Sequence, residues 1–308
     1  MIVLALGRGL SGALRPRVVL PLWLLTVVLA LPVAMAYGLL FHDGTSQLPD
    51  PAARAEGFQP PHLDDFERQE ASALRSISDA SGLASWTHVL VMGLLAGGLI
   101  FSFDTRGRQF REERGEKLEL GTLLQASARH LGAMLVVLLV AIGAFALVDW
   151  LINGLFAGWL TPRFTRVEDE RTALVVDWLQ QGFYLLVLLF TASWLDLSRA
   201  SIVIEGRSVI TGLIDGLKSV VRHPLTILLG IGGLVLLEIV LTWLGARLLS
   251  TITTGSWGGL AAWFAGAQLL VLIRIVFGLW RLGTLTSVVE IDRDEREDRE
   301  TALPGSLA

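Results

Sequence analysis

The chain has no cysteine, and charged residues make up only 18% of its 308 residues. Without cysteine there are no disulfides, no thiolate nucleophiles and no cysteine-ligated metal sites. Three common enzyme signatures are also missing: the His-Glu-x-x-His zinc motif, the Gly-x-Ser-x-Gly nucleophile motif and the Gly-Lys-Ser/Thr phosphate loop. The formal net charge is a small −4. We therefore predict a non-enzymatic protein with no metal, no cofactor and no nucleic-acid partner.

Hydrophobic residues, in contrast, account for 53% of the chain and gather in six long runs. Each run is close to the length of about 20 residues that a helix needs to cross a hydrocarbon core of roughly 30 Å. Backbone polar groups in lipid must be hydrogen-bonded within the protein, and the runs do not alternate as barrel strands do. The sequence predicts an all-α polytopic membrane protein. Its six transmembrane helices are expected near residues 18–41, 85–103, 131–158, 174–197, 224–249 and 258–282.

Most of the 25 Lys and Arg residues lie in the connections of one side. These are the N-terminal segment, the connections after the second and fourth runs, and the C-terminal tail. The positive-inside rule then places both termini in the cytoplasm and arranges the helices as three in-out-in hairpins of a bacterial inner membrane. Residues 1–36 also match a secretory signal, with a small-residue cleavage pattern over 31–36. The apolar run continues to Phe41, which favours a retained helix, and cleavage stays an alternative.

Only one connection on the opposite side is sizeable, the external loop over residues 42–84. It carries Leu63, Phe66, Leu74 and Ile77 at helical spacing among acidic residues, which predicts a short amphipathic helix; a solvated acidic linker is the alternative. At the other end, residues 290–308 mix charges densely and are expected to form a frayed or disordered cytoplasmic tail. Residues 1–289 are expected to form one transmembrane domain.

The second and third hairpins resemble each other at an offset of 93 residues. Arg129-His130 matches Arg222-His223, and Trp150 matches Trp243. Both hairpins are preceded by an amphipathic stretch on the cytoplasmic side, at residues 118–124 and 209–217. A helix of this kind lies in the headgroup plane beside its basic residues. We interpret the pattern as a parallel duplication.

Residues 196–207 (DLSRASIVIEGR), followed by 212–224 ending in Val-Arg-His-Pro, resemble a junction between helices in a family of multi-pass bacterial inner-membrane proteins. The similarity covers mainly residues 85–285. A more distant likeness is to the membrane region attached to some glycerophosphodiester phosphodiesterases, and no segment here resembles their soluble catalytic domain. The resemblance implies a six-helix architecture and no activity.

Polar residues inside the runs are the candidates for a membrane-buried site, because ionisable groups are costly there. Glu238 and Gln268 fall at similar depth on the last two helices, where a hydrogen bond between them is feasible. Arg274 lies nearer the inner end of the sixth helix, and its side chain could extend inward or reach towards Glu238. The three residues suit a proton- or substrate-binding site; the alternatives are a polar clamp between helices or a protonated Glu238.

A second polar cluster is expected near the outer helix ends, where Asp149, Asp177 and Arg247 occur. Its members suit interfacial ion pairs that tie the second hairpin to the third. The alternative is the active site of a lipid-modifying enzyme.

We therefore expect an accessory or scaffold subunit that packs against membrane lipids or another integral membrane protein. A small transporter or permease using Glu238, Gln268 and Arg274 is the first alternative, and a lipid-modifying enzyme the second.

Overall fold

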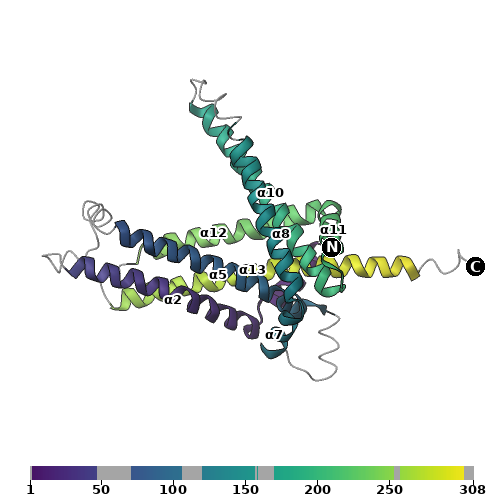
Figure 1. The fold of residues 1–308 in the computed structure, drawn as a ribbon, viewed down its shortest axis with the longest axis horizontal. Coiled ribbons are helices and arrows are strands. Elements are labelled where there is room, and N and C mark those ends of the chain that lie inside the picture. Colours follow the sequence, from purple (N-terminus) through teal and green to yellow (C-terminus); the bar gives the residue numbers. More distant parts are fainter. Residues whose placement is uncertain are drawn as a thin grey trace, which may run out of the picture. The chain divides into compact units, whose positions relative to one another are not determined.

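A computed structural model describes residues 2–46, 71–105, 120–156, 158, 170–252 and 257–301, and every regular element in these ranges is a helix (Figure 1). Six helices are long and apolar enough to cross a membrane, which confirms the predicted all-α, multi-pass membrane fold. The spans are Pro16–Ala36, Ala71–Phe103, Leu131–Phe156, Leu174–Ile204, Thr226–Leu249 and Ala261–Asp298.

Three short helices each precede a spanning helix. The elements in chain order are α1 (Ile2–Ala13), α2 (Pro16–Ser46), α5 (Ala71–Phe103), α7 (Leu120–Arg129), α8 (Leu131–Asp149), the π-helix η1 (Trp150–Phe156), α10 (Glu170–Ile204), α11 (Val209–Arg222), the π-helix η2 (Thr226–Ile231), α12 (Gly232–Leu249) and α13 (Trp257–Thr301). The two predicted amphipathic stretches are the short helices α7 and α11. A third short helix, α1, precedes the first spanning helix.

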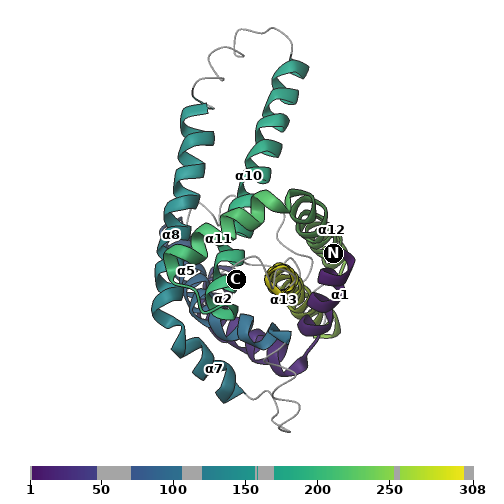
Figure 2. The same cartoon turned by 90° about the vertical axis from the view of Figure 1, so that its right-hand side faces the viewer.

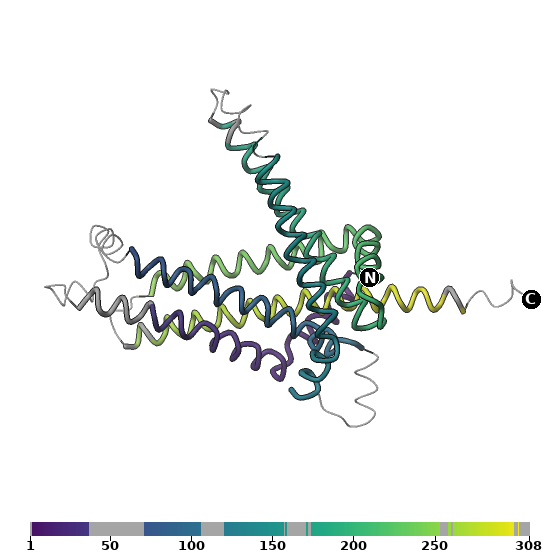
Figure 3. The backbone as a smooth tube through the Cα atoms, in the orientation of Figure 1, coloured from purple at the N-terminus to yellow at the C-terminus, as the bar shows by residue number. Residues whose placement is uncertain are grey.

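Two spanning helices extend well beyond their predicted ends. Residues 71–84, expected in the external loop, continue α5 as one helix, whereas Leu63 and Phe66 lie outside the described residues. Helix α13 continues to Thr301 without a break, so residues 290–301 are helical where a frayed tail was expected (Figure 3). Residues 283–290 of α13 are all buried. Because tertiary packing supplies most of the stability of a helix in a protein, this buried stretch favours continuation of the helix into the charged residues that follow.

Two compact units can be distinguished in the chain. Unit 1 comprises Met1–Ala13, Gly93–Val235 and Leu279–Ala308, and unit 2 comprises Leu14–Met92 and Leu236–Gly278. Helices α5, α12 and α13 contribute one part to each unit. Unit 1 thus holds all three short helices and the helix ends that they contact.

In unit 1, α1 packs against α13 and α11 packs against α10 in the same way. The Trp280 indole N–H donates to the Leu6 carbonyl at 2.8 Å, and three residues further along α1 a Cβ on Gly9 would lie 2.7 Å from the Thr284 backbone nitrogen. In the second case, the Trp194 indole N–H donates to the Leu213 carbonyl, also at 2.8 Å. A Cβ on Gly216, three residues after Leu213, would lie 2.7 Å from the Ser198 backbone nitrogen. The contacting residues therefore have the same spacing along the helices in both crossings.

The third crossing, between α7 and α5, uses the same register with the glycine on the opposite helix. A Cβ on Gly98 of α5 would lie 2.2 Å from the Leu123 carbonyl oxygen of α7. Leu123 corresponds to Gly216 at the predicted offset of 93 residues. The Gly98 backbone N–H also donates to the Ser127 hydroxyl at 3.2 Å. Small residues are what allow helix backbones to approach this closely.

The structure therefore contains three repeats, each made of one short helix and two spanning helices. They are α1–α2–α5, α7–α8–α10 and α11–α12–α13. Each short helix contacts the last spanning helix of the preceding repeat, and α1 closes the cycle on the last helix of the chain. The second and third of these repeats are the two hairpins for which the sequence predicts a duplication.

The main core of unit 1 joins residues of α1, α5, α10, α11, η2 and α13. Its buried members are Ala5, Ile100, Leu197, Ala200, Val220, Ile227, Ile231, Leu285, Val288 and Val289. Helices α8 and α10 run side by side away from this core (Figure 2). Each π-helix falls within a spanning segment: η1 continues α8, and η2 follows Pro224, which opens its helix where a missing N–H costs little. A π-turn inserts one residue and so shifts the helix face that follows.

Candidate functional site

Glu238 and Arg274 lie together in unit 2, facing each other from α12 and α13. The Arg274 Nε is 3.7 Å from the Glu238 Oε1. Glu238 lies near the centre of its span, since Thr226 and Leu249 end that span, and at 1.5 Å per residue each end is roughly 17 Å away. The Glu238 side chain is 25% exposed and that of Arg274 is 67% exposed. An ion pair at mid-span therefore opens onto the surface of the molecule.

Two glycines place this pair by bringing α12 and α13 close together. A Cβ on Gly245 of α12 would lie 2.3 Å from the Leu270 side chain, and a Cβ on Gly266 of α13 would lie 2.4 Å from that of Leu249. Along this antiparallel seam, Glu238 comes about two turns before Gly245 on α12. The glycines hold the helices near enough for the shorter glutamate to reach the arginine.

Gln268, the third predicted member, has a different partner. Its Oε1 accepts the Trp23 indole N–H of α2 at 3.1 Å, within unit 2. An indole N–H in an apolar environment needs an acceptor, and the amide oxygen supplies it. The hydrogen bond expected between Gln268 and Glu238 is not among those of the described residues. Gln268 therefore ties α13 to α2, while the charged pair stands on its own.

The outer polar cluster divides between the two units. Asp149 lies in unit 1, where its Oδ1 accepts from the Asn153 amide at 2.8 Å and the Tyr184 hydroxyl at 3.2 Å. Asp177 is exposed on α10, about two turns from Tyr184. Arg247 belongs to unit 2, and its guanidinium lies 5.6 Å from the centre of the Trp243 ring, one turn away on α12. Asp149 thus bridges η1 and α10 as a local clamp.

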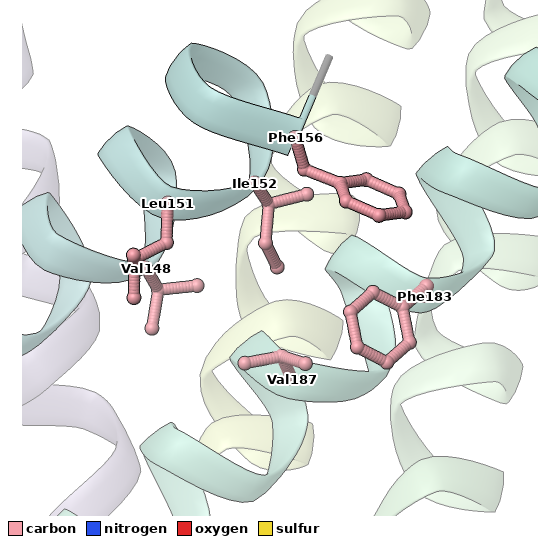
Figure 4. Close-up of a pocket in the computed structure, with 6 residues that line it drawn as sticks. All are labelled: Val148, Leu151, Ile152, Phe156, Phe183 and Val187. Atoms are coloured by element: carbon pink, nitrogen blue, oxygen red, sulfur yellow. The ribbon is translucent and has the colours of Figure 1, made fainter. Parts of the chain in front are cut away.

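An apolar hollow lies beside that clamp, between η1 and α10 (Figure 4). It has a volume of about 310 Å³. Its walls are Val148, Leu151, Ile152, Phe156, Phe183 and Val187. The phenyl rings of Phe156 and Phe183 face each other across the hollow, and all of its lining side chains are apolar. Such walls suit hydrocarbon and offer nothing to orient a polar substrate.

Unit 1 also holds a network of buried carboxylates that the sequence did not reveal. Glu290 of α13 is buried, and its two carboxylate oxygens accept from the backbone N–H and the hydroxyl of Thr105, at 2.5 and 2.8 Å. The guanidinium of Arg8 lies 3.9 Å away. One side chain of α13 therefore joins α1 to the end of α5.

Asp292, also buried, joins α13 to α11. It accepts from the Ser219 hydroxyl at 3.1 Å and lies 2.8 Å from the His223 Nε2. His130, the counterpart of His223 in the second repeat, has a different environment. Burial, together with the neighbouring Arg129, lowers the pKa of His130. The two histidines that look alike in sequence therefore differ in chemistry.

Two further carboxylates bind arginines of α13. Glu205, at the end of α10, pairs with Arg296 and with Arg207, whose Nε lies 3.0 Å away. This hydrogen bond to Glu205 raises the pKa of Arg207. Asp196 of α10 lies 3.8 Å from the Arg281 Nε. The contacts of Glu290, Asp292, Glu205 and Asp196 with other helices join residues 69 to 282 positions apart in the chain, so no local spacing signals them. The only hint of these contacts in the sequence is the dense mixture of acidic and basic residues after residue 290, which is compatible with a helix.

No protein-family model matches this chain, and comparisons with curated proteins and with solved structures give no match. The resemblances stated from the sequence stay predictions about architecture. Among the described residues, no group of three or more His, Asp or Glu side chains is placed to hold a metal ion.

Proposed function

We propose that this integral membrane protein is a non-catalytic scaffold subunit that assembles laterally with another membrane protein through the surface around Glu238 and Arg274. We call this surface the paired-charge face. The observation that carries the proposal is the position of the pair: mid-span, and open to the surrounding medium on the Arg274 side. We further propose that both termini lie in the cytoplasm of a bacterial inner membrane, on the distribution of basic residues.

In a membrane, the exposed side chain of Arg274 is surrounded by hydrocarbon. An arginine at the centre of a spanning helix costs about 2.5–3.5 kcal/mol on insertion scales. Its pairing with Glu238 offsets part of this cost, but a side chain that is 67% exposed still meets hydrocarbon over most of its surface. Covering it with polar or charged groups of a partner removes that contact. Lateral assembly is therefore the favourable state of this face.

The transporter alternative uses the same residues, and two contacts weigh against it. Gln268 is engaged by Trp23, and Glu238 already faces a fixed cation, so neither is left as a ligand for a substrate. The lipid-modifying alternative needs two carboxylates that act on one bond. Asp149 is held by Asn153 and Tyr184, whereas Asp177 stands exposed elsewhere on α10, which gives no such pair.

The proposal can be tested by cross-linking, because the chain has no cysteine to interfere. A cysteine is placed at Leu241, one turn from Glu238, and carries a photoreactive label; the control is Leu236→Cys on the same helix. Both leucines are exposed, and Leu236 points about 160° away from Glu238 at 100° per residue. Illumination in native membranes is expected to give one defined protein adduct from position 241 and lipid adducts from position 236.

A second comparison ties the adduct to the charges. In a Glu238→Gln/Arg274→Gln background, the adduct from position 241 is expected to disappear while the amount of inserted protein stays unchanged. If position 241 gives only lipid adducts in the wild-type background, lateral assembly at this face is wrong. In that case, measurement of proton flux in vesicles, with and without Glu238→Gln, decides whether the transporter alternative replaces it.

A further inference from the structure

We infer that the partner at the paired-charge face is a second copy of this chain, with Glu238 of each protomer meeting Arg274 of the other. The inference rests on the proposed function, since it names the occupant of the same face. Three features of the described residues support it: the self-complementary charge, the common depth of the two side chains, and the open space beside Arg274.

The common depth follows from the ion pair itself. Two copies inserted in the same orientation are related by a twofold axis along the membrane normal, and rotation about that axis leaves every residue at its own depth. Glu238 and Arg274 approach within 3.7 Å, so they lie at nearly equal depth. The rotation therefore brings the acid of one copy level with the base of the other, twice. An acid and a base at different depths would not meet in this way.

The pair within one chain also leaves capacity for a second partner. At 3.7 Å, the approach of Arg274 Nε to Glu238 Oε1 is longer than a hydrogen bond. A guanidinium has five donors and binds a carboxylate best through two parallel bonds. Each Arg274 is therefore able to contact its own glutamate and a second one across an interface.

There is also room for a second helix. Gly278 follows Arg274 by about one turn on α13, and a Cβ built on it would meet nothing within 4 Å. A glycine beside a polar group is the arrangement that lets two membrane helices approach closely. In contrast, the space beside Gly245 and Gly266 is occupied by leucine side chains of the same hairpin.

The test is a charge exchange that preserves the pair within each chain. The variant Glu238→Arg/Arg274→Glu keeps one acid facing one base, so it is expected to insert and fold as the wild type does. Between two variant chains the exchanged contacts are again attractive. Between a variant chain and a wild-type chain they become Glu against Glu and Arg against Arg, which is the repulsion that specificity requires.

Wild-type and exchanged chains carrying two different affinity tags are co-expressed in all combinations and extracted with their surrounding lipid. Like chains are expected to copurify, wild type with wild type and variant with variant. Copurification of wild type with variant is expected to fall about tenfold, the scale of a difference of 1.4 kcal/mol. Equal copurification of like and unlike chains would overturn the inference, because the contact would then lie elsewhere.

Failure of wild-type chains to copurify at all would also overturn it. If the protein adduct at position 241 is nevertheless formed and contains a different protein, the scaffold proposal stands and only the identity of the partner is wrong. If no protein adduct is formed either, both fail.

Discussion

The close approach of the α11 and α10 backbones at Gly216 gives a sharp prediction about the stability of the protein. Gly216→Ala places a methyl group 2.3 Å from the Ser198 hydroxyl, 2.7 Å from its nitrogen and 2.9 Å from its Cα. Two of these three atoms are backbone, so no side-chain rotation relieves the clash and α11 must move away from α10. Overpacking of this kind costs about 1–3 kcal/mol, and backbone atoms place it at the upper end. Alanine regains about 1 kcal/mol of helix propensity.

We therefore expect Gly216→Ala to lower the free energy of unfolding by about 1–2 kcal/mol, the difference between these two contributions. The matched control is Gly182→Ala in α10, whose added Cβ meets nothing within 4 Å and which should leave stability unchanged or raised. Unfolding in mixed micelles, followed by tryptophan fluorescence during titration with a denaturing detergent, measures both. Equal stability of the two variants would refute the close packing of α11 on α10.

Three further outcomes follow from single contacts. Asp292→Ala leaves Ser219 and His223 without their acceptor. It is expected to lower the free energy of unfolding by about 2–3 kcal/mol in the same titration, as for hydrogen bonds to a charged group. A loss below about 0.5 kcal/mol, the scale of an ordinary surface substitution, would contradict this expectation. Gln268→Leu strands the Trp23 indole N–H and should destabilise by about 1–3 kcal/mol, whereas addition of Trp23→Phe should restore part of the loss because the donor is then removed as well. If the apolar stripe of α11 lies on the membrane, Leu217→Cys will be shielded from a water-soluble thiol reagent in vesicles, and Arg222→Cys, about 140° away around the helix at 100° per residue, will react; equal rates would contradict this, since both side chains are exposed in the isolated chain.

The spanning helices were predictable because the signal for them is local. A run of about 20 apolar residues forms a helix in lipid whatever else the chain does. The short helix α1 was missed for a related reason. Residues 2–13 were interpreted as the start of a possible leader, and their role depends on Gly9 meeting Thr284, 275 residues away, which no local pattern contains.

The candidate site was predictable only as far as depth along a helix allows. Counting residues placed Glu238 and Gln268 at similar depth and left Arg274 nearer the inner end of its helix, within reach of Glu238. The structure pairs Arg274 with Glu238. Counting residues does not tell which way a side chain points around the helix axis, so it could not show that Gln268 and Glu238 have different partners. Trp23, which binds Gln268, comes from the first spanning helix. The rotation of α12 and α13 about their axes depends on tertiary packing, including the contacts at Gly245 and Gly266, and the spacing of residues in the sequence does not specify it.

The threefold repeat gives an independent reason to regard the charged pair as functional. The registers of the three crossings align Glu238 with Phe145 in the second repeat and Leu31 in the first, and they align Arg274 with Leu188 and His88. The same helix-hairpin architecture is thus built in the second repeat with apolar residues at both positions. A pair required for the hairpin fold itself would be needed there as well. Because the charges occur in one repeat, where they cost the most free energy and face outward, the simplest account is that this repeat meets something that the others do not.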